Sequence, residues 1–338
     1  MDVRKVLEGL TLEEKRALLE DLREAIAREL DPGRPEPDRC PWCGCAERSR
    51  KGRDRDGARR WLCKGCGRTF SAKSMGVLAY SKLPPESWMS FAECEADLLT
   101  LRDAAARVGV CLSTAWFMRM RVHEVMASRL QPFRARSRSQ VDGTYLPESF
   151  SGNHRGAFGL PRAAHRNGRD ARRGGRARLS VCVLCGANDL GDAFARLASR
   201  GKPSGPDLFF ALEGAVGEGS LVETDGWAGY RRELPALGAA HAEAPSRRLA
   251  MVNSLHSRLK GFLARFRGVS TRRLQGYLDC FCYREQHRSP QVDRRELIYL
   301  DECEGSYLHT RRALADVPRP FVVDWYRAPE LGGLKGTA

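Results

Sequence analysis

Two short cysteine pairs near the start of the chain constrain its fold more than any other feature. Cys40 and Cys43 form one C-x-x-C pair, and Cys63 and Cys66 form a second, with residues 44–62 between them. Each C-x-x-C turn presents two thiolates at the spacing that tetrahedral zinc requires. The sequence therefore predicts a zinc ribbon over residues 37–75, with one structural Zn²⁺ held by Cys40, Cys43, Cys63 and Cys66.

The rest of the chain favours metal binding over disulfides for these cysteines. Residues 1–30 are charged throughout and lack the apolar core of a signal peptide, and no apolar run reaches the roughly 18 residues of a membrane span. We therefore expect a protein that remains inside the cell, where thiols stay reduced. Cys45 is a spare cysteine, and it replaces Cys43 as a ligand if the ribbon has a different register.

The charge of the chain points to a polyanionic partner. The formal net charge is +15, and residues 47–60, inside the predicted ribbon, are very basic. Such a surplus is typical of proteins that bind nucleic acid, although it also occurs on surfaces charged for solubility. The basic ribbon suits contact with phosphates, and a ribbon that binds only protein is the alternative.

The segments around the ribbon are predicted to be helical. Residues 1–36 read as amphipathic helix and linker, with a capping box at Thr11 and Glu14. Residues 76–130 have the layout of a helix-turn-helix, in which the second helix enters the major groove. Its predicted DNA contacts are Ser113, Thr114, Arg119 and Arg121. Three-helix units of this shape also occur without DNA.

Residues 138–290 alternate strands and helices, which predicts an α/β domain with a mixed sheet. Asp142 lies within one strand and Asp225 ends a later one. Two such acids can hold a pair of divalent cations, or they are merely strand-end caps and salt bridges. The helix expected at 250–266 carries Asn253, His256 and Lys260 on one polar strip, where Asn253 is either a helix cap or part of an active site. Residues 291–338, a C-terminal extension, show no motif.

Several motifs in order give the chain a family resemblance over roughly residues 37–287. They include "CPWCGC…WLCKGCGRTF", "VDGTYLPESFSG", "VETDGWAGY" and "VNSLHSRLKGFLARF". The chain resembles bacterial insertion-sequence transposases of the zinc-ribbon, ISXO-like group, a DDE-type family with an Asp, Asp, Asn, Lys signature. The resemblance implies a ribonuclease H-like catalytic domain, with Asp142 on its first strand and Asp225 after its fourth. It also implies catalytic roles for Asn253, where related transposases carry a third acid, and for Lys260.

The function implied by the resemblance is DNA transposition. The chain would bind the terminal inverted repeats of its element, cut there and join the freed end to target DNA. Two Mg²⁺ or Mn²⁺ ions would be held by Asp142, Asp225 and Asn253. The implied partners are double-stranded DNA and further copies of the chain, as a homodimer or higher oligomer, with no membrane. The implied location is the cytoplasm of a bacterium, at the nucleoid.

One departure from the family pattern leaves an alternative open. The family usually carries an acid directly after its first Asp, and this chain has Gly143. Glu148 and Glu223 are candidates for the missing charge. A catalytically degenerate copy that only binds DNA is the alternative function, and a structure-selective nuclease is a third.

Three further features accompany the predicted site. The basic loop 165–178, with Arg172 and Arg173, is read as a DNA-contacting arm or as a solvated loop. His256 is an auxiliary candidate, as metal ligand or proton shuttle, against the alternative of a histidine that bonds a backbone group. Trp227 is read as a core or rim aromatic, with base stacking as the alternative.

Overall fold

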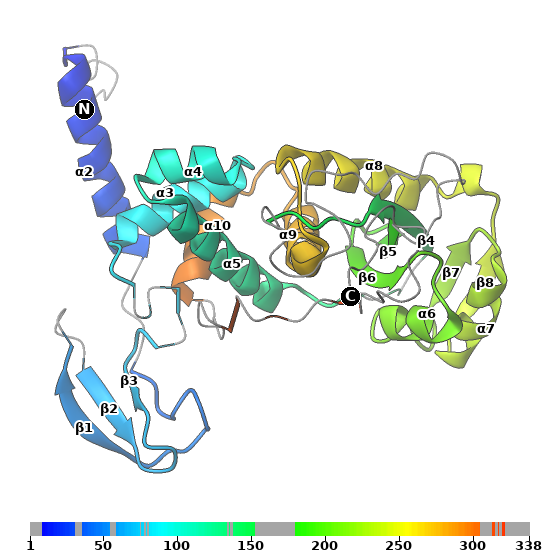
Figure 1. The fold of residues 1–338 in the computed structure, drawn as a ribbon, viewed down its shortest axis with the longest axis horizontal. Helices are drawn as coiled ribbons and strands as arrows, with labels where there is room; N and C mark the ends of the chain where they lie inside the picture. The colour runs from blue at the N-terminus through cyan, green and yellow to red at the C-terminus, as the bar shows by residue number, and fades with distance from the viewer. Residues whose placement is uncertain are drawn as a thin grey trace, which may run out of the picture. The chain divides into compact units, whose positions relative to one another are not determined.

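The computed structural model describes residues 9–30, 36–54, 59–74, 76–77, 79, 81–133, 135, 138–152, 180–304, 313–314, 317 and 320–321. The chain forms two compact units (Figure 1). The first consists of Met1–Ser128 and Gln291–His309, and the second of Arg129–Pro290 and Thr310–Ala338.

The first unit combines helices with a small antiparallel sheet. Its elements are α2 (Leu12–Leu30), β1 (Arg48–Arg53), β2 (Arg59–Cys63), β3 (Thr69–Phe70), α3 (Pro85–Ala96), α4 (Leu101–Val108), α5 (Leu112–Arg129) and α10 (Arg294–Glu304). The three strands pair in the order β1-β2-β3. The predicted capping box is confirmed, because the Thr11 N–H donates to the Glu14 carboxylate at 2.8 Å and the Glu14 N–H donates to Thr11 Oγ1 at 3.3 Å.

Helices α4 and α5 occupy the segment in which two helices and a turn were predicted. Thr100 caps α4 by accepting from the Asp103 N–H, and Gly109 ends it with a left-handed φ of 74°. A left-handed residue at this position is strongly favoured to be glycine, because a Cβ would be strained there. The turn between the helices is therefore encoded locally.

The C-terminal helix α10 belongs to the first unit, although no motif marked it in the sequence. It packs against α3, and Arg295 forms an ion pair of 2.9 Å with Asp97, the residue that follows α3. Tyr299 and Glu302 of α10 are buried. The chain thus returns after the α/β unit to complete the core of the helical unit.

The structure corrects the predicted role of two arginines in α5. Arg119 is 1% exposed, donates to the Glu95 carboxylate at 2.7 Å and donates to the Leu99 carbonyl. Arg121 is 4% exposed and donates to the backbone carbonyls of Val77 and Ala79. Both guanidinium groups hold the helical unit together from inside, so the prediction that they contact DNA is wrong for this fold.

Replacing Arg119 should therefore damage folding. In Arg119→Met, the Glu95 carboxylate would stay buried without its guanidinium partner, which should cost about 3–5 kcal/mol of unfolding free energy. Denaturant unfolding measures this loss. The exposed Arg102 in α4 provides a matched control, and Arg102→Met should change the unfolding free energy by less than about 0.5 kcal/mol. Equal effects of the two variants would contradict the burial argument.

The second unit is built on a five-stranded mixed sheet in the order β6-β5-β4-β7-β8. Its elements are β4 (Arg138–Pro147), β5 (Ser180–Asn188), β6 (Ala193–Arg200), α6 (Gly205–Leu212), β7 (Leu221–Thr224), α7 (Ala228–Ala236), β8 (Ala240–Glu243), α8 (Ala250–Arg265) and α9 (Leu274–Gln286), with single 3-10 turns at Ser246–Arg248 and Thr271–Arg273. Strands β4, β5 and β6 pair antiparallel, whereas β7 runs parallel to both β4 and β8.

Helices cover both faces of this sheet (Figure 1). Helices α6 and α7 bury apolar side chains against one face, where Val141, Leu184 and Val222 meet Leu208, Leu212 and Leu234. Helices α8 and α9 pack on the other face, against β4, β5 and β6. Within the part of the chain that the structure describes, no helix combines the length and apolarity needed to cross a bilayer.

Candidate functional site

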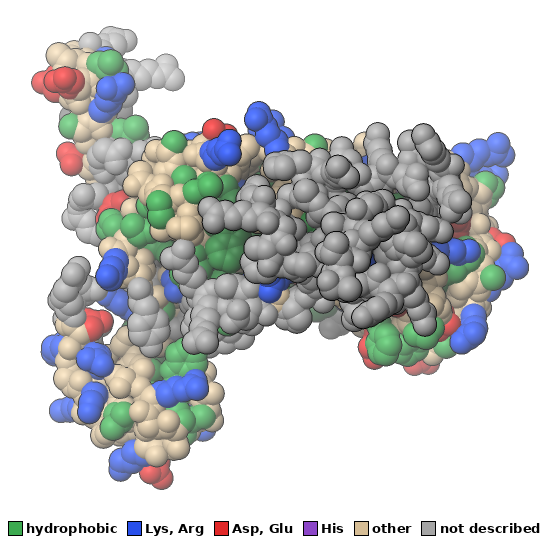
Figure 2. All heavy atoms as spheres, in the orientation of Figure 1, with side chains coloured by type: hydrophobic (Ala, Val, Ile, Leu, Met, Phe, Trp, Pro, Cys, Tyr) green, Lys and Arg blue, Asp and Glu red, His purple; other side chains and the backbone are tan. Residues whose placement is uncertain are grey.

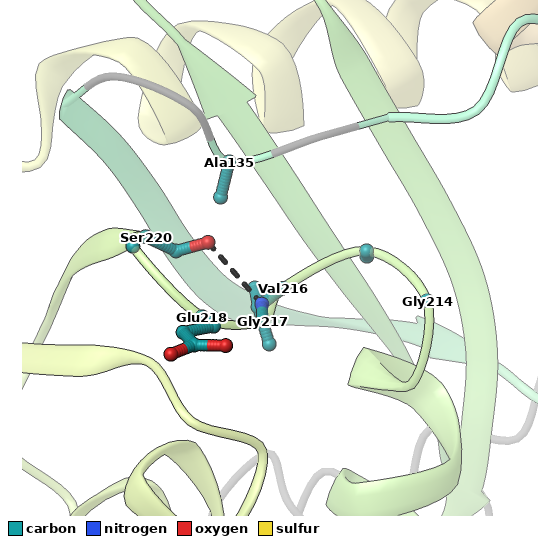
Figure 3. Close-up of a pocket in the computed structure, with 8 residues that line it drawn as sticks. Ala135, Gly214, Val216, Gly217, Glu218 and Ser220 are labelled. Atoms are coloured by element: carbon teal, nitrogen blue, oxygen red, sulfur yellow. Dashed lines mark hydrogen bonds between the residues drawn. The ribbon is translucent and has the colours of Figure 1, made fainter.

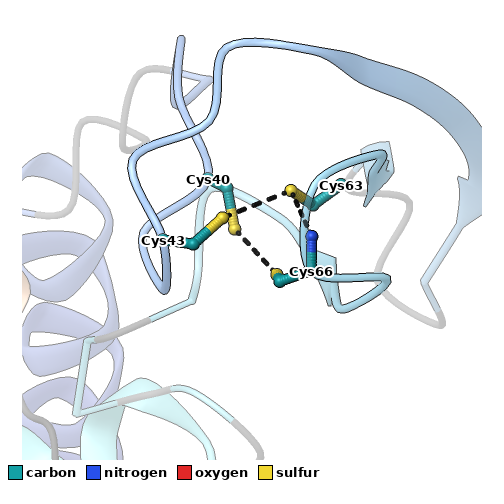
Figure 4. A group of neighbouring side chains, drawn as sticks. All are labelled: Cys40, Cys43, Cys63 and Cys66. Carbon is teal, nitrogen blue, oxygen red and sulfur yellow. Dashed lines mark hydrogen bonds between the residues drawn. The ribbon is translucent and has the colours of Figure 1, made fainter.

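The four predicted zinc ligands come together in the first unit. The sulfur atoms of Cys40, Cys43, Cys63 and Cys66 lie within 4.8 Å of one another (Figure 4). This is the spacing of a tetrahedral thiolate site. Among the described residues, these four form the one group of three or more histidine, cysteine or acidic side chains arranged to hold a metal ion. Cys45 is outside it, and its thiol contacts the Glu47 carbonyl.

The four thiols of the cluster do not ionise alike. The Cys66 N–H, 3.4 Å from Cys63 Sγ, lowers the pKa of Cys63 to about 6. The neighbouring cysteine thiols, Cys63 first among them, raise the pKa of Cys43 to about 12. A thiolate is the ligand form of cysteine, so Cys63 is the member of the cluster that most readily offers one near neutral pH.

The exposed face of the ribbon carries arginines stacked on tryptophans. Arg48 lies 4.2 Å and Arg59 5.8 Å from the centre of the Trp61 ring, and Arg68 lies 5.4 Å from that of Trp42. Arg53 and Arg59 are direct partners across β1 and β2, where two like charges repel. Figure 2 shows Lys and Arg side chains distributed over this part of the chain. The ribbon surface is therefore suited to a polyanion.

In the second unit, Asp142 lies in β4, and Asp225 directly follows β7, the parallel neighbour of β4. The two strands pair with Arg138 opposite Leu221 and Gln140 opposite Glu223, and β7 ends at Thr224. Because side chains alternate along a strand, Asp142 shares a face of β4 with Gln140. A hydrogen bond of 3.0 Å joins Gln140 to Glu223, so the strand residues that precede the two aspartates are in direct contact.

Local backbone groups orient both carboxylates. The Gly143 N–H donates to Asp142 Oδ1 at 2.8 Å, and the Trp227 N–H donates to Asp225 Oδ1 at 3.1 Å. Burial raises the pKa of Tyr230 well above its usual value, and the charges of Asp142 and Asp225 raise it further. Both acids thus lie near the same tyrosine, as expected for two carboxylates at one end of the sheet.

Helix α8 approaches Asp142 through His256, one residue of its polar strip. Asn253 and Lys260 are exposed, whereas Val252, Leu255 and Leu259 are fully buried. His256 is 7% exposed, and its ring donates to the backbone carbonyl of Asp142. Burial lowers the pKa of His256 to about 4, so the ring is neutral. Cys185 pairs with Asp142 across the sheet, and burial raises the pKa of its thiol well above the usual value. The charge of Asp142 raises this pKa further, and the charge of Lys260 lowers it.

The capping interpretation of Asn253 is wrong. Helix α8 begins at Ala250, its N-cap residue is Leu249, and no side chain of that residue caps it. The Asn253 Nδ2 instead donates to the Ser246 carbonyl at 2.9 Å. This bond fixes the amide nitrogen and leaves Oδ1 as the end of the side chain available to a ligand. His256 shows the bond to a backbone group that was the alternative to a catalytic role.

Neither candidate for an extra acid is available to the site. Glu223 is held by Arg138 at 2.8 Å and by Gln140, and Glu148 is 5% exposed and pairs with Arg200 at 2.6 Å. A side chain at position 143 would point to the opposite face of β4 from Asp142, because the side chains of consecutive strand residues alternate. A Cβ there would lie 3.1 Å from Cys182 Sγ, which is tighter than ordinary contact.

The remaining predicted residues lie in different surroundings. Ser113 and Thr114 occupy the first turn of α5, and both hydroxyls contact the exposed Cys111 thiol. Trp227 is a half-buried rim aromatic with the Lys202 ammonium 4.7 Å from its ring centre and Tyr230 against its edge. Arg172, Arg173 and loop 165–178 lie outside the described residues.

A pocket of about 370 Å³ lies at the other end of the sheet (Figure 3). It is lined by Ala135 and by residues 214–220, which precede β7, whereas Asp225 follows that strand. Its one ionisable lining group is Glu218. The pocket therefore does not contribute to the site around Asp142 and Asp225.

No protein-family model matches this chain, and no curated protein matches it. Its function is therefore inferred from its own residues. Sequence reasoning missed Gln140, which is 2% exposed and contacts both Glu223 and α8. A glutamine in a strand, two residues from Asp142 and on the same face, was the available signal.

Proposed function

We propose that this chain is a DNA transposase of an insertion sequence, acting through Asp142, Asp225, Asn253 and Lys260. The observation that carries the proposal is the parallel pairing of β4, which contains the half-buried Asp142, with β7, which is directly followed by the exposed Asp225. β7 is the fourth strand of its unit, as the family resemblance requires of the strand before the second Asp. The mixed sheet with helices on both faces is compatible with the ribonuclease H-like fold.

The donor set fits hard divalent cations. Asp142 and Asp225 offer carboxylate oxygens, and Asn253 offers an amide oxygen, which are ligands that Mg²⁺ and Mn²⁺ accept. When bound, a pair of such ions activates a water or a 3′ hydroxyl and stabilises the leaving oxygen of a phosphodiester. The protein's part is to hold these oxygens in place: the Gly143 and Trp227 N–H groups orient the carboxylates, and Ser246 orients the amide.

Lys260 supplies the positive charge of the proposed site. It lies seven residues after Asn253, which corresponds to about 10 Å along a helix at 1.5 Å per residue. A long, exposed lysine can reach a DNA phosphate next to the carboxylates. Gly143 is compatible with an active enzyme, because an acid at this position would point to the opposite face from Asp142.

Recognition of DNA is assigned to the first unit. The proposed contacts are the four-cysteine ribbon with its stacked arginines and the start of α5, at the exposed Ser113 and the half-buried Thr114. Helix-turn-helix docking would bring the start of α5 to the major groove. Zinc is the proposed metal of the ribbon, since thiolate sets of this spacing select it.

Joining two DNA ends needs more than one copy of the chain, and α2 offers a surface for it. Leu12, Leu18, Leu19 and Leu22 are all exposed by 42–66% and fall within one stripe of the helix. Exposed apolar stripes of this kind mark pairing surfaces. We propose that α2 contributes to a homodimer or higher oligomer.

The proposed activity can be tested with a labelled duplex that carries the ends of the element. With Mg²⁺ or Mn²⁺, the intact protein should cut one strand at the end and join the 3′ hydroxyl to a target duplex. Chelation of the divalent ion should stop both steps. Tight binding to the ends without cleavage under any of these metals would refute the enzyme and favour the DNA-binding alternative.

Asn253→Ala separates a role in the site from a role in folding. The variant loses one exposed hydrogen bond, which should lower the unfolding free energy by no more than about 1.5 kcal/mol. Cleavage should fall by about 10-fold to 100-fold, as for loss of a group that tunes a metal site. Measuring thermal unfolding and cleavage on the same variant distinguishes a role of Asn253 in the site from a role in folding. A loss of stability with unchanged cleavage would remove Asn253 from the site.

A further inference from the structure

Helix α8 is tied to strand β4 by a buried glutamine from the strand. Gln140 Oε1 accepts the N–H groups of Met251 at 2.9 Å and Val252 at 3.4 Å. Its Nε2 donates to the Glu223 carboxylate and to the Arg248 carbonyl, each at 3.0 Å. Gln140 thereby joins β4, β7 and the start of α8 through a single side chain.

This contact takes the place of a missing N-cap. The first turn of a helix has N–H groups without intrahelical partners, and a cap residue usually satisfies them. The N-cap residue of α8 is Leu249, which has no side chain able to do so. Gln140 accepts two of these N–H groups from a neighbouring strand, so the start of α8 is defined by tertiary structure.

A second tie runs in the opposite direction, from α8 to β4. The His256 ring donates to the Asp142 carbonyl, whereas its Nε2 is buried with no hydrogen-bond partner among the described residues. The donor is therefore Nδ1, and the neutral ring is held in a single tautomer. Gln140, on the strand, thus forms hydrogen bonds with the backbone of the helix, and His256, on the helix, forms one with the backbone of the strand at Asp142.

We propose that Gln140 and His256 are positioning residues that together set the register of α8 on β4. The inference rests on the proposed function, because the register fixes Asn253 and Lys260 relative to Asp142. Asn253 lies between the two ties along the helix. The apolar residues Val252, Leu255 and Leu259 hold α8 on the sheet, but apolar contact is non-directional. The hydrogen bonds of Gln140 and of His256 are directional and come from opposite partners, so together they prevent the helix from sliding or turning.

The test compares Gln140→Met with a matched control in the same unit. Gln275 of α9 makes an equivalent tie to β6: it accepts the Leu197 N–H at 2.9 Å and donates to the Ala195 carbonyl at 3.3 Å. Gln275→Met removes the same chemical group far from Asp142 in the sheet order. At saturating duplex and Mn²⁺, turnover of Gln140→Met should fall by about 10²-fold, as for a misplacement of about 1 Å, while that of Gln275→Met is unchanged.

The histidine is tested by rescue. His256→Leu removes the donor to the Asp142 carbonyl, whereas the amide of His256→Asn can offer an N–H close to the position of Nδ1. Turnover should fall by about 10²-fold in His256→Leu and recover most of this loss in His256→Asn. Duplex affinity should change by less than about twofold in all four variants, since the loss is in the chemical step.

Two further readouts keep the inference separate from the proposed activity. Hydrogen exchange at the Met251 and Val252 amides should accelerate in Gln140→Met and not in Gln275→Met. Mn²⁺ affinity should likewise weaken in Gln140→Met and not in Gln275→Met. If the intact protein cleaves no DNA, the proposed function fails, and these two measurements still show whether Gln140 sets the register of α8 on β4. Equal effects of both glutamine variants, or no rescue by His256→Asn, would overturn the inference.

Discussion

Asp142→Asn and Asp225→Asn should each abolish metal-dependent strand cleavage while leaving binding to the element ends intact. Asp142 lies in β4, Asp225 directly follows the parallel neighbour β7, and a backbone N–H orients each carboxylate, so either substitution removes half of the negative charge that the two aspartates would offer to the ions. We expect cleavage to fall by about 10³-fold or more, which corresponds to roughly 4 kcal/mol of transition-state stabilisation. The double variant should be little worse than either single one, because groups that act as a unit are not additive.

A control at the opposite end of β7 tests whether the loss of cleavage depends on the position of the acid or only on the loss of one negative charge. Glu218 is an exposed acid before β7, and Glu218→Gln removes one negative charge without touching the Asp142 site. Its cleavage rate should match that of the unmodified protein in a gel assay with a labelled duplex. Residual cleavage in the double Asp variant near the unmodified rate would exclude the proposed site.

If residues 37–75 bind zinc and DNA as proposed, chelating the metal should unfold this segment and weaken DNA binding. The ribbon's core is small: Cys40, Cys63 and Phe70 are buried, with Trp42, Cys45 and Trp61 packed against them. So few apolar groups cannot fold a segment of this size, and binding of the metal then supplies the folding free energy. Chelation or Cys63→Ser should change the fluorescence of Trp42 and Trp61, while the α/β unit retains its own unfolding transition.

The control for the ribbon uses its spare cysteine. Cys45 lies outside the group of four, and Cys45→Ser should keep one zinc per chain and the tryptophan fluorescence of the folded ribbon. Metal analysis of the purified variants gives the stoichiometry. Loss of zinc in Cys45→Ser with retention in Cys43→Ser would identify Cys45 as the fourth ligand.

The features that sequence predicted correctly are encoded by neighbouring residues. Helix α8 was expected at 250–266 and spans Ala250–Arg265, because its apolar residues repeat with the helical period. The strand around Asp142 was likewise found where the apolar pattern indicated, whereas the strand expected to end in Asp225 ends one residue earlier, at Thr224. The burial of Arg119 could not be predicted, since its partner Glu95 lies on a different helix.

By itself, the sequence determined the four clustered cysteines, the capping box at Thr11 and the polar strip of α8, since each depends on spacing within a few turns of chain. Only the tertiary structure decided that β7 lies beside β4, that α10 returns to α3 and that Gln140 takes the place of a cap on α8. Those contacts join residues far apart in the chain, and their free energy depends on which surfaces become buried together. The local pattern identifies the candidate residues, and non-local packing places β4, the strand β7 and helix α8, which carry or precede them, against one another.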